Sequence, residues 1–99
     1  VEGIRAMLTR QPARGYLGCM EAIGETDLVE STARLRLPTL GFAASEDGST
    51  PADLVRETVE SVPGSQFHLI RRAGHLACVE HPAEYAGTLQ AFLEAVGHI

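Results

Sequence analysis

The sequence predicts an α/β fold in which two parallel strands alternate with helices. Residues 37–44 form a mostly apolar segment of strand length without regular polar alternation, which is typical of a strand covered on both faces. Residues 66–70 form a second strand-like segment, and an amphipathic helical pattern follows each of the two. Short strands joined by a helix indicate a right-handed crossover between parallel strands.

The first third of the chain predicts three short helices. Apolar residues at helical spacing occupy residues 1–10, and Pro12 interrupts them because proline disfavours a helical residue before it. A second helix is expected over residues 12–23, with Gly24 as its stop. A third is expected over residues 27–34, capped by the aspartate at its start. The second helix has one apolar face: Tyr16, Cys19, Met20 and Ile23.

The helix after the first strand is predicted from its start signals. Thr50 supplies a hydroxyl cap and Pro51 the first helical residue. The helix should run to about residue 62 with four residues facing inward: Leu54, Val55, Val59 and Val62. Residues 63–65 turn the chain into the second strand. The last helix, residues 82–96, should end at Gly97 and has five residues on its apolar side: Tyr85, Leu89, Phe92, Leu93 and Val96.

Size and charge limit the classes of function. Ninety-nine residues suit one small domain. The formal net charge is −5, and the basic residues, all arginine, are scattered, so we expect no nucleic-acid partner. No apolar run approaches the roughly 20 residues that a membrane helix needs, so we expect no membrane partner.

Cys19 and Cys78 lack a CxxC pattern and predict reduced, buried thiols of a cytoplasmic protein. Since the chain starts with neither methionine nor a signal peptide, we expect it to begin partway through a larger domain.

Two polar loops follow the predicted strands and carry Asp47 and His75. Ligands of open α/β sheets bind outside the carboxyl ends of the strands, so both side chains should lie at one rim. A carboxylate there can bind one imidazole nitrogen and leave the other free to take a proton from a nucleophile. The alternatives remain open: Asp-Gly is often only a turn, His75 can be a solvated loop residue, and an Asp–His pair can be structural.

Other polar residues are weaker candidates for a site. Glu46, beside Asp47, is the alternative acid, with a surface role as the plainer interpretation. His68 and His98 have no partner that the sequence identifies. The spacing of His75, Cys78 and His81 could suggest a metal site. A closed structural site needs a fourth ligand, and none is evident, so no metal is expected.

Two segments carry a resemblance to a known family. Residues 37–51, with Asp47-Gly48-Ser49-Thr50-Pro51, resemble the acid-bearing strand and loop of α/β-hydrolases, and residues 73–85, with Ala73-Gly74-His75, resemble their histidine loop. Residues 15–23, with Asp27-Leu28, narrow the resemblance to the 3-oxoadipate enol-lactonases of bacterial aromatic catabolism. The chain departs from the pattern at Gly48, where many members have proline, and it contains no Gly-x-Ser-x-Gly nucleophile motif.

The resemblance implies the C-terminal part of an α/β-hydrolase fold, with residues 1–36 as a helical lid-return segment and residues 37–99 as a strand-helix-strand-helix unit. It implies a carboxylic ester hydrolase without a cofactor, most similar to those acting on 3-oxoadipate enol-lactone. Asp47 would be the triad acid and His75 the general base, with the serine upstream of Val1, so the chain alone should be inactive. Another esterase activity, a non-catalytic fragment and an interaction module remain alternatives.

The resemblance also suggests substrate contacts. Arg71 and Arg72 could attract the carboxylate of an enol-lactone, or be ordinary surface charges. Three residues of the second predicted helix could approach the substrate, or simply pack: Tyr16, Cys19 and Met20. Because two parallel strands are too few for an independently stable sheet, we expect the chain to self-associate by strand pairing or exchange of elements.

Overall fold

Two parallel strands form the centre of the structure, a computed structural model that describes residues 1–99. Strand β1 (Leu40–Ala44) pairs with β2 (Gln66–Ile70). Their register places Ala44 opposite Ile70, so both strands end at the same edge of the sheet. The parallel pairing predicted from the sequence is confirmed, although β1 begins at Leu40, three residues after the start of the predicted segment 37–44.

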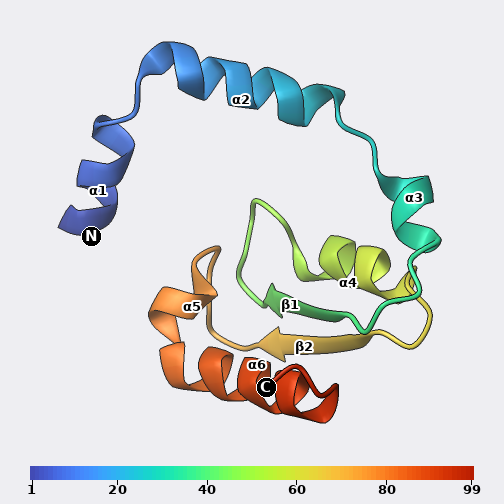
Figure 1. Ribbon diagram of the computed structural model, residues 1–99. Helices are drawn as coiled ribbons and strands as arrows, with labels where there is room; N and C mark the ends of the chain where they lie inside the picture. The colour runs from blue at the N-terminus through green and yellow to red at the C-terminus, as the bar shows by residue number, and fades with distance from the viewer.

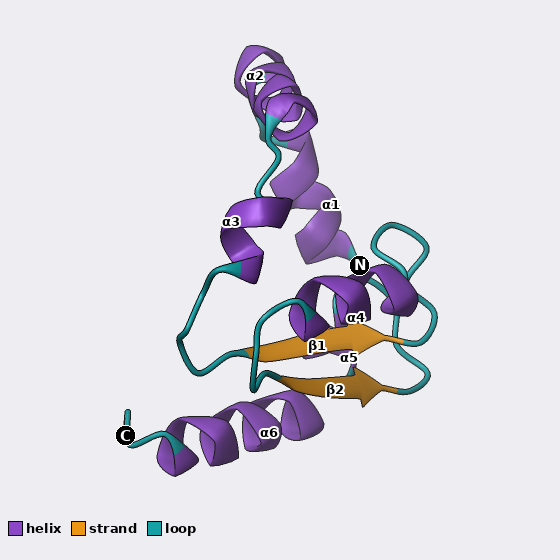
Figure 2. Ribbon diagram, turned by 90° about the vertical axis from the view of Figure 1, so that its right-hand side faces the viewer, coloured by secondary structure: helices purple, strands orange, loops and turns teal.

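Helices cover both faces of this small sheet. Helix α4 (Ala52–Glu60) lies on one face and α6 (Pro82–Ala95) on the other, as Figure 2 shows. The chain thus forms two strands between two helical layers, the arrangement expected of a parallel sheet. A single helical turn, α5 (Ala77–Glu80), lies between β2 and α6 and was not predicted. No helix in the chain is both long and apolar enough to cross a membrane.

Three helices precede the sheet, as predicted: α1 (Glu2–Thr9), α2 (Ala13–Glu25) and α3 (Val29–Ala33). Figure 1 shows α1 and α2 extending away from the strands, with α3 nearer to α4. None of the three contains a buried residue. Helix α2 ends at Glu25, two residues beyond the predicted end at residue 23, so Gly24 lies inside the helix and is not its stop. The apolar face of α2, which includes Met20, is exposed rather than packed, because no other element covers it.

The core is small and consists mainly of short side chains from the carboxyl ends of the strands and from the loops beyond them. Ile70 is fully buried and packs with three alanines, while Phe42 and Tyr85 lie against this cluster. The alanines are Ala44, Ala73 and Ala77. Because small side chains let the backbone segments approach closely, the loops that follow β1 and β2 are held near each other.

Some residues expected to face inward are exposed. Leu54 was predicted to pack on the sheet, but it lies on the side of α4 that faces α3. Leu89 and Val96 of the last helical segment are also exposed, because a two-stranded sheet is too narrow to cover the whole apolar side of α6. The predicted burial of Cys19 and Cys78 is wrong as well. Both thiols are free and exposed, since α2 has no packed face and α5 lies beside an open hollow.

Helix α4 packs directly on the backbone of β1 at Gly41. A Cβ atom added to Gly41 would overlap Cγ2 of Val59, a buried residue of α4. The missing side chain thus allows the helix to lie against the strand. This close packing fixes the position of α4 and of the loop that leads into it.

Candidate active site

Asp47 and His75 meet at the edge of the sheet where both strands end. Asp47 lies three residues beyond β1, and His75 lies five residues beyond β2. The arrowheads of both strands in Figure 1 point to this edge, next to α5. Nδ1 of His75 lies 2.9 Å from Oδ2 of Asp47, within hydrogen-bond distance. The two loops therefore lie at one rim, as the sequence predicted.

The loop after β1 closes on the carboxylate of Asp47. Its Oδ1 accepts the backbone N–H groups of Ser49 (2.9 Å) and Thr50 (3.1 Å), and its Oδ2 accepts the Thr50 hydroxyl (2.9 Å). Asp47 is thus both a turn residue and the partner of His75. The predicted role of Thr50 as a helix cap is wrong, because its hydroxyl binds Asp47, and Pro51 occupies the position before α4.

These contacts hold the pKa of Asp47 well below its ordinary value. The hydrogen bond from His75 is the largest cause, followed by the backbone N–H of Thr50. Desolvation opposes the shift, while the Thr50 hydroxyl and the Ser49 N–H add to it. The side chain of Asp47 is only 7% exposed, which by itself would favour the neutral acid. Each of its oxygens accepts two hydrogen bonds, and these stabilise the ionised form more strongly. Asp47 is therefore an ionised acceptor near neutral pH.

Because the carboxylate can only accept, Nδ1 of His75 carries the proton of their shared hydrogen bond. In a neutral ring this leaves Nε2 as the free basic nitrogen. The side chain is 60% exposed and lies at a hollow of about 170 Å³, so Nε2 is accessible. The hollow lies between β1, α5 and the loop after β1, and the residues that line it include Phe42, Asp47, Thr50, Cys78 and Tyr85. Such a pair can remove a proton from a hydroxyl that enters the hollow.

The segment that carries the histidine, residues 71–76, is held by contacts on both sides; we call it the histidine loop. The carbonyl of Ala73 accepts the backbone N–H of Glu46 over 2.9 Å. The N–H of Gly74 donates to the Glu80 carboxylate over 2.8 Å. Glu46, the alternative acid, thus contacts this loop through its backbone, while Asp47 supplies the carboxylate that pairs with His75.

The remaining histidines lie outside this pair. His68 of β2 lies 2.7 Å from the carboxylate of Glu84 on α6, a contact that no sequence signal identified because it joins separate elements. His81 binds the carbonyl of Arg72 over 3.1 Å. The chain contains no group of three or more His, Cys, Asp or Glu side chains that could hold a metal ion.

The proposed substrate contacts do not line the hollow beside His75. Arg71 and Arg72 are exposed, and neither borders it. Tyr16 lines a separate apolar hollow formed with α1, and Met20 is exposed on α2. Cys78, which was predicted to be a buried thiol and was weighed only as a metal ligand, borders the hollow.

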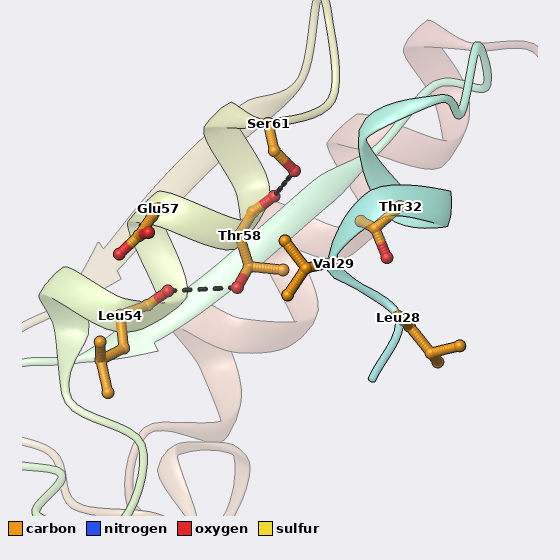
Figure 3. A pocket seen from close by; sticks show the side chains of 7 residues that line it. All are labelled: Leu28, Val29, Thr32, Leu54, Glu57, Thr58 and Ser61. Carbon is orange, nitrogen blue, oxygen red and sulfur yellow. Dashed lines mark hydrogen bonds between the residues drawn. The ribbon is translucent and has the colours of Figure 1, made fainter. Parts of the chain in front are cut away.

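A larger hollow, of about 410 Å³, lies between α3 and α4 and is shown in Figure 3. Two of its hydroxyls are already bonded to carbonyls of α4: Thr58 donates to the Leu54 carbonyl, and Ser61, the residue after the helix, donates to the Thr58 carbonyl. The only charged residue that lines it is Glu57. It contains no acid–base pair, whereas Asp47 and His75 form one at the edge of the sheet.

Comparison with known proteins relates the chain to a superfamily of enzymes with several activities rather than to one enzyme. The sequence is 28% identical to 3-oxoadipate enol-lactonase 1 of Acinetobacter baylyi over 89 residues, 90% of this chain and 33% of that enzyme. It is 26% identical to the pimeloyl-[acyl-carrier protein] methyl ester esterase of Serratia marcescens over 95 residues, 93% of this chain and 37% of that enzyme. No protein-family model matches the sequence.

The solved structures that resemble the chain share its fold. A hydrolase from Pseudomonas aeruginosa is 34% identical with a TM-score of 0.85, over 93% of this chain and 34% of that one. The chain spans about a third of the length of the relatives it matches. It therefore has the fold of the C-terminal part of an α/β-hydrolase, as predicted, and its relatives include esterases and lactonases.

Proposed function

We propose that residues 1–99 form part of an α/β-hydrolase that cleaves carboxylic esters, in which Asp47 is the acid and His75 the base of a catalytic triad. The observation that carries this proposal is the 2.9 Å hydrogen bond between Nδ1 of His75 and Oδ2 of Asp47 at the carboxyl edge of a parallel sheet. That bond fixes the ring while Nε2 remains accessible at the hollow.

The proposed reaction follows from this geometry. Nε2 of His75 takes the proton of a serine hydroxyl supplied from outside residues 1–99, and the serine oxygen attacks the ester carbonyl. Asp47 stabilises the resulting imidazolium, which then protonates the leaving oxygen and gives an acyl-enzyme. His75 next removes a proton from water, the hydroxide attacks the acyl carbon, and the proton returns to the serine oxygen. In a lactone, the leaving enol oxygen remains joined to the acyl group through the carbon chain, so the second step releases a single product molecule.

The specific substrate we propose is 3-oxoadipate enol-lactone. The similarity to the Acinetobacter baylyi lactonase, which extends over 89 residues and 90% of this chain, supports it. The Serratia marcescens relative acts on a methyl ester, so a different carboxylic ester is the competing substrate. We also propose a cytoplasmic location, supported by the two free thiols.

A chimera tests the proposal. Residues 1–99 would replace the corresponding third of the Acinetobacter baylyi lactonase, which supplies a complete hydrolase around them, and hydrolysis of the enol-lactone and of p-nitrophenyl acetate would be measured. The chimera should hydrolyse the lactone, and His75→Ala should abolish turnover of both substrates while His98→Ala should not. A folded His75→Ala chimera with undiminished activity would overturn the acid–base proposal; turnover of only the simple ester would overturn the choice of lactone.

Residues 1–99 alone should hydrolyse no ester, because they contain no Gly-x-Ser-x-Gly nucleophile. For this isolated chain we propose self-association. Its accessible surface is 7695 Å², whereas a compact chain of this mass exposes about 5,500 Å². Its radius of gyration is 15.7 Å, against about 12.6 Å for a compact domain of this length. A second copy that covers the exposed apolar side chains would remove this surface from water.

A further inference from the structure

Arg72 has a backbone conformation that its side chain disfavours. Its φ angle is 59°, and it is the only residue other than glycine with a positive φ. In this left-handed region the Cβ atom crowds the following carbonyl, so such a residue persists only where its surroundings hold it. Arg72 lies three residues before His75, in the histidine loop.

Side chains from two separate loops hold both polar groups of the Arg72 backbone. Its N–H donates to the hydroxyl oxygen of Ser45, the residue directly after β1, over 2.9 Å. Its carbonyl accepts from Nε2 of His81, the residue directly before α6, over 3.1 Å. Arg72 is therefore held by one hydrogen bond to the residue after β1 and by another to the residue before α6.

These two bonds act on the part of the loop that determines the direction of His75. The next residue, Ala73, is fully buried, and its carbonyl accepts from the backbone of Glu46, the residue after Ser45. The His75 side chain is 60% exposed, so packing against neighbours contributes little to its orientation. Its direction depends on its bond to Asp47 and on the path of the backbone that leads to it.

We propose that Ser45 and His81 are positioning residues for His75. By holding Arg72 in the left-handed conformation they set the path of the histidine loop, so that Nδ1 meets Asp47 and Nε2 faces the hollow. They touch neither the substrate nor the reacting atoms. The catalytic consequence rests on the proposed function, whereas the effect on the His75 ring can be measured in residues 1–99 by themselves.

Nuclear magnetic resonance of the chain labelled with ¹⁵N-histidine gives the direct readout, because long-range ¹H–¹⁵N correlations distinguish the Nδ1–H from the Nε2–H tautomer. The wild-type chain should show His75 with a protected Nδ1–H. Ser45→Ala and His81→Ala should each cause loss of that resonance and a mixture of tautomers. Ser45→Thr and His81→Gln, which keep a hydroxyl and a side-chain N–H, should retain part of the signal. Ser31→Ala, an exposed serine of α3, and His98→Ala serve as matched controls that leave it unchanged.

Arg72→Gly separates positioning from general stability. Glycine adopts a positive φ without crowding, so the double variant Ser45→Ala/Arg72→Gly should regain the Nδ1–H resonance that Ser45→Ala loses. Retention of the wild-type resonance in both alanine variants would overturn the proposal, and so would failure of Arg72→Gly to restore it. In the chimera, Ser45→Ala should lower kcat and leave KM unchanged. A chimera without activity but with an intact Nδ1–H signal would refute the proposed function and leave the positioning role standing.

Discussion

The hydroxyl of Thr50 and the imidazole of His75 donate to the same oxygen of Asp47, each over 2.9 Å. An ionised carboxylate oxygen has lone pairs for both donors, so the two bonds do not compete. Thr50 follows Asp47 by three residues and is held in the same loop, whereas His75 arrives from the other strand. Thr50 therefore fixes the direction in which Oδ2 presents its remaining lone pair to the imidazole.

We predict that Thr50→Val, which keeps the shape of the side chain but removes the hydroxyl, raises the pKa of Asp47. The pKa should remain below its ordinary value, because His75 and the backbone N–H groups still stabilise the ionised form. A ¹³C titration of the carboxyl group measures the change. Thr50→Ser, which keeps the donor, should behave like the wild type, and an unchanged Asp47 pKa in Thr50→Val would contradict this account.

The lowered pKa of Asp47 predicts how stability depends on pH. The carboxyl group binds protons more readily in the unfolded chain, where its pKa is about 3.9, than in the folded one. Its contribution to stability is therefore complete above that ordinary value and is lost as the pH falls through the lower folded pKa. Urea unfolding at pH 7 and at a series of lower pH values measures the free energy of unfolding. That free energy should fall less with decreasing pH for Asp47→Asn than for the wild type. Glu30→Gln, at an exposed side chain of α3, should follow the wild type.

In the chimera, Asp47→Asn should lower kcat by roughly 10⁴-fold, the loss found when an amide replaces a triad acid and favours the wrong imidazole tautomer. The effect on KM should be small, because the acid contacts the imidazole rather than the substrate. Steady-state kinetics on the lactone measures both constants. Glu46→Gln is the matched control, since the side chain of Glu46 is exposed and only its backbone contacts the histidine loop. Equal losses from both variants would argue against a special role for Asp47.

Sequence patterns were sufficient to predict the strands and the meeting of the two loops. Gln66–Ile70 was placed correctly because proline and glycine mark its start and its residues are mostly apolar. The parallel pairing followed from the intervening helix, and it brings Asp47 and His75 to one edge. These features depend on local periodicity and on the topology of α/β sheets, both of which are visible in a sequence.

Features that depend on contacts between distant elements could not be predicted. The His68–Glu84 pair joins β2 to α6, and the left-handed Arg72 is held by residues on either side of it in space. Thr50 was interpreted as a cap because Thr-Pro resembles a helix start; its spacing of three residues from Asp47 was the available signal for its actual partner. The exposure of Cys19 could not be foreseen either, since a helical face gives no indication of whether anything covers it.

We predict that Gly41→Ala destabilises the chain by about 1–3 kcal/mol, because the new Cβ would overlap Val59 and push α4 away from β1. Gly87→Ala is a matched control with the opposite expected sign. A Cβ there has nothing within 4 Å, and replacing a glycine inside a helix by alanine stabilises by about 0.5–1 kcal/mol. Urea unfolding measures both changes. In a Val59→Ala background, which lacks the overlapping Cγ2, Gly41→Ala should cost less stability than it does in the wild type; an equal cost in both backgrounds would mean that the overlap is not its cause.

The proposed self-association predicts a concentration-dependent sedimentation coefficient for residues 1–99, with dimers or larger species at micromolar concentration. The reason is that the apolar side chains of α1 and α2 and the outer edges of the two-stranded sheet have no partner within the chain. Met20→Glu with Ile23→Glu should weaken the assembly, because both residues are exposed on α2 and burying carboxylates in an interface is costly. A monomer at every concentration would contradict the proposal, since the apolar surface would then be stable in water without cover.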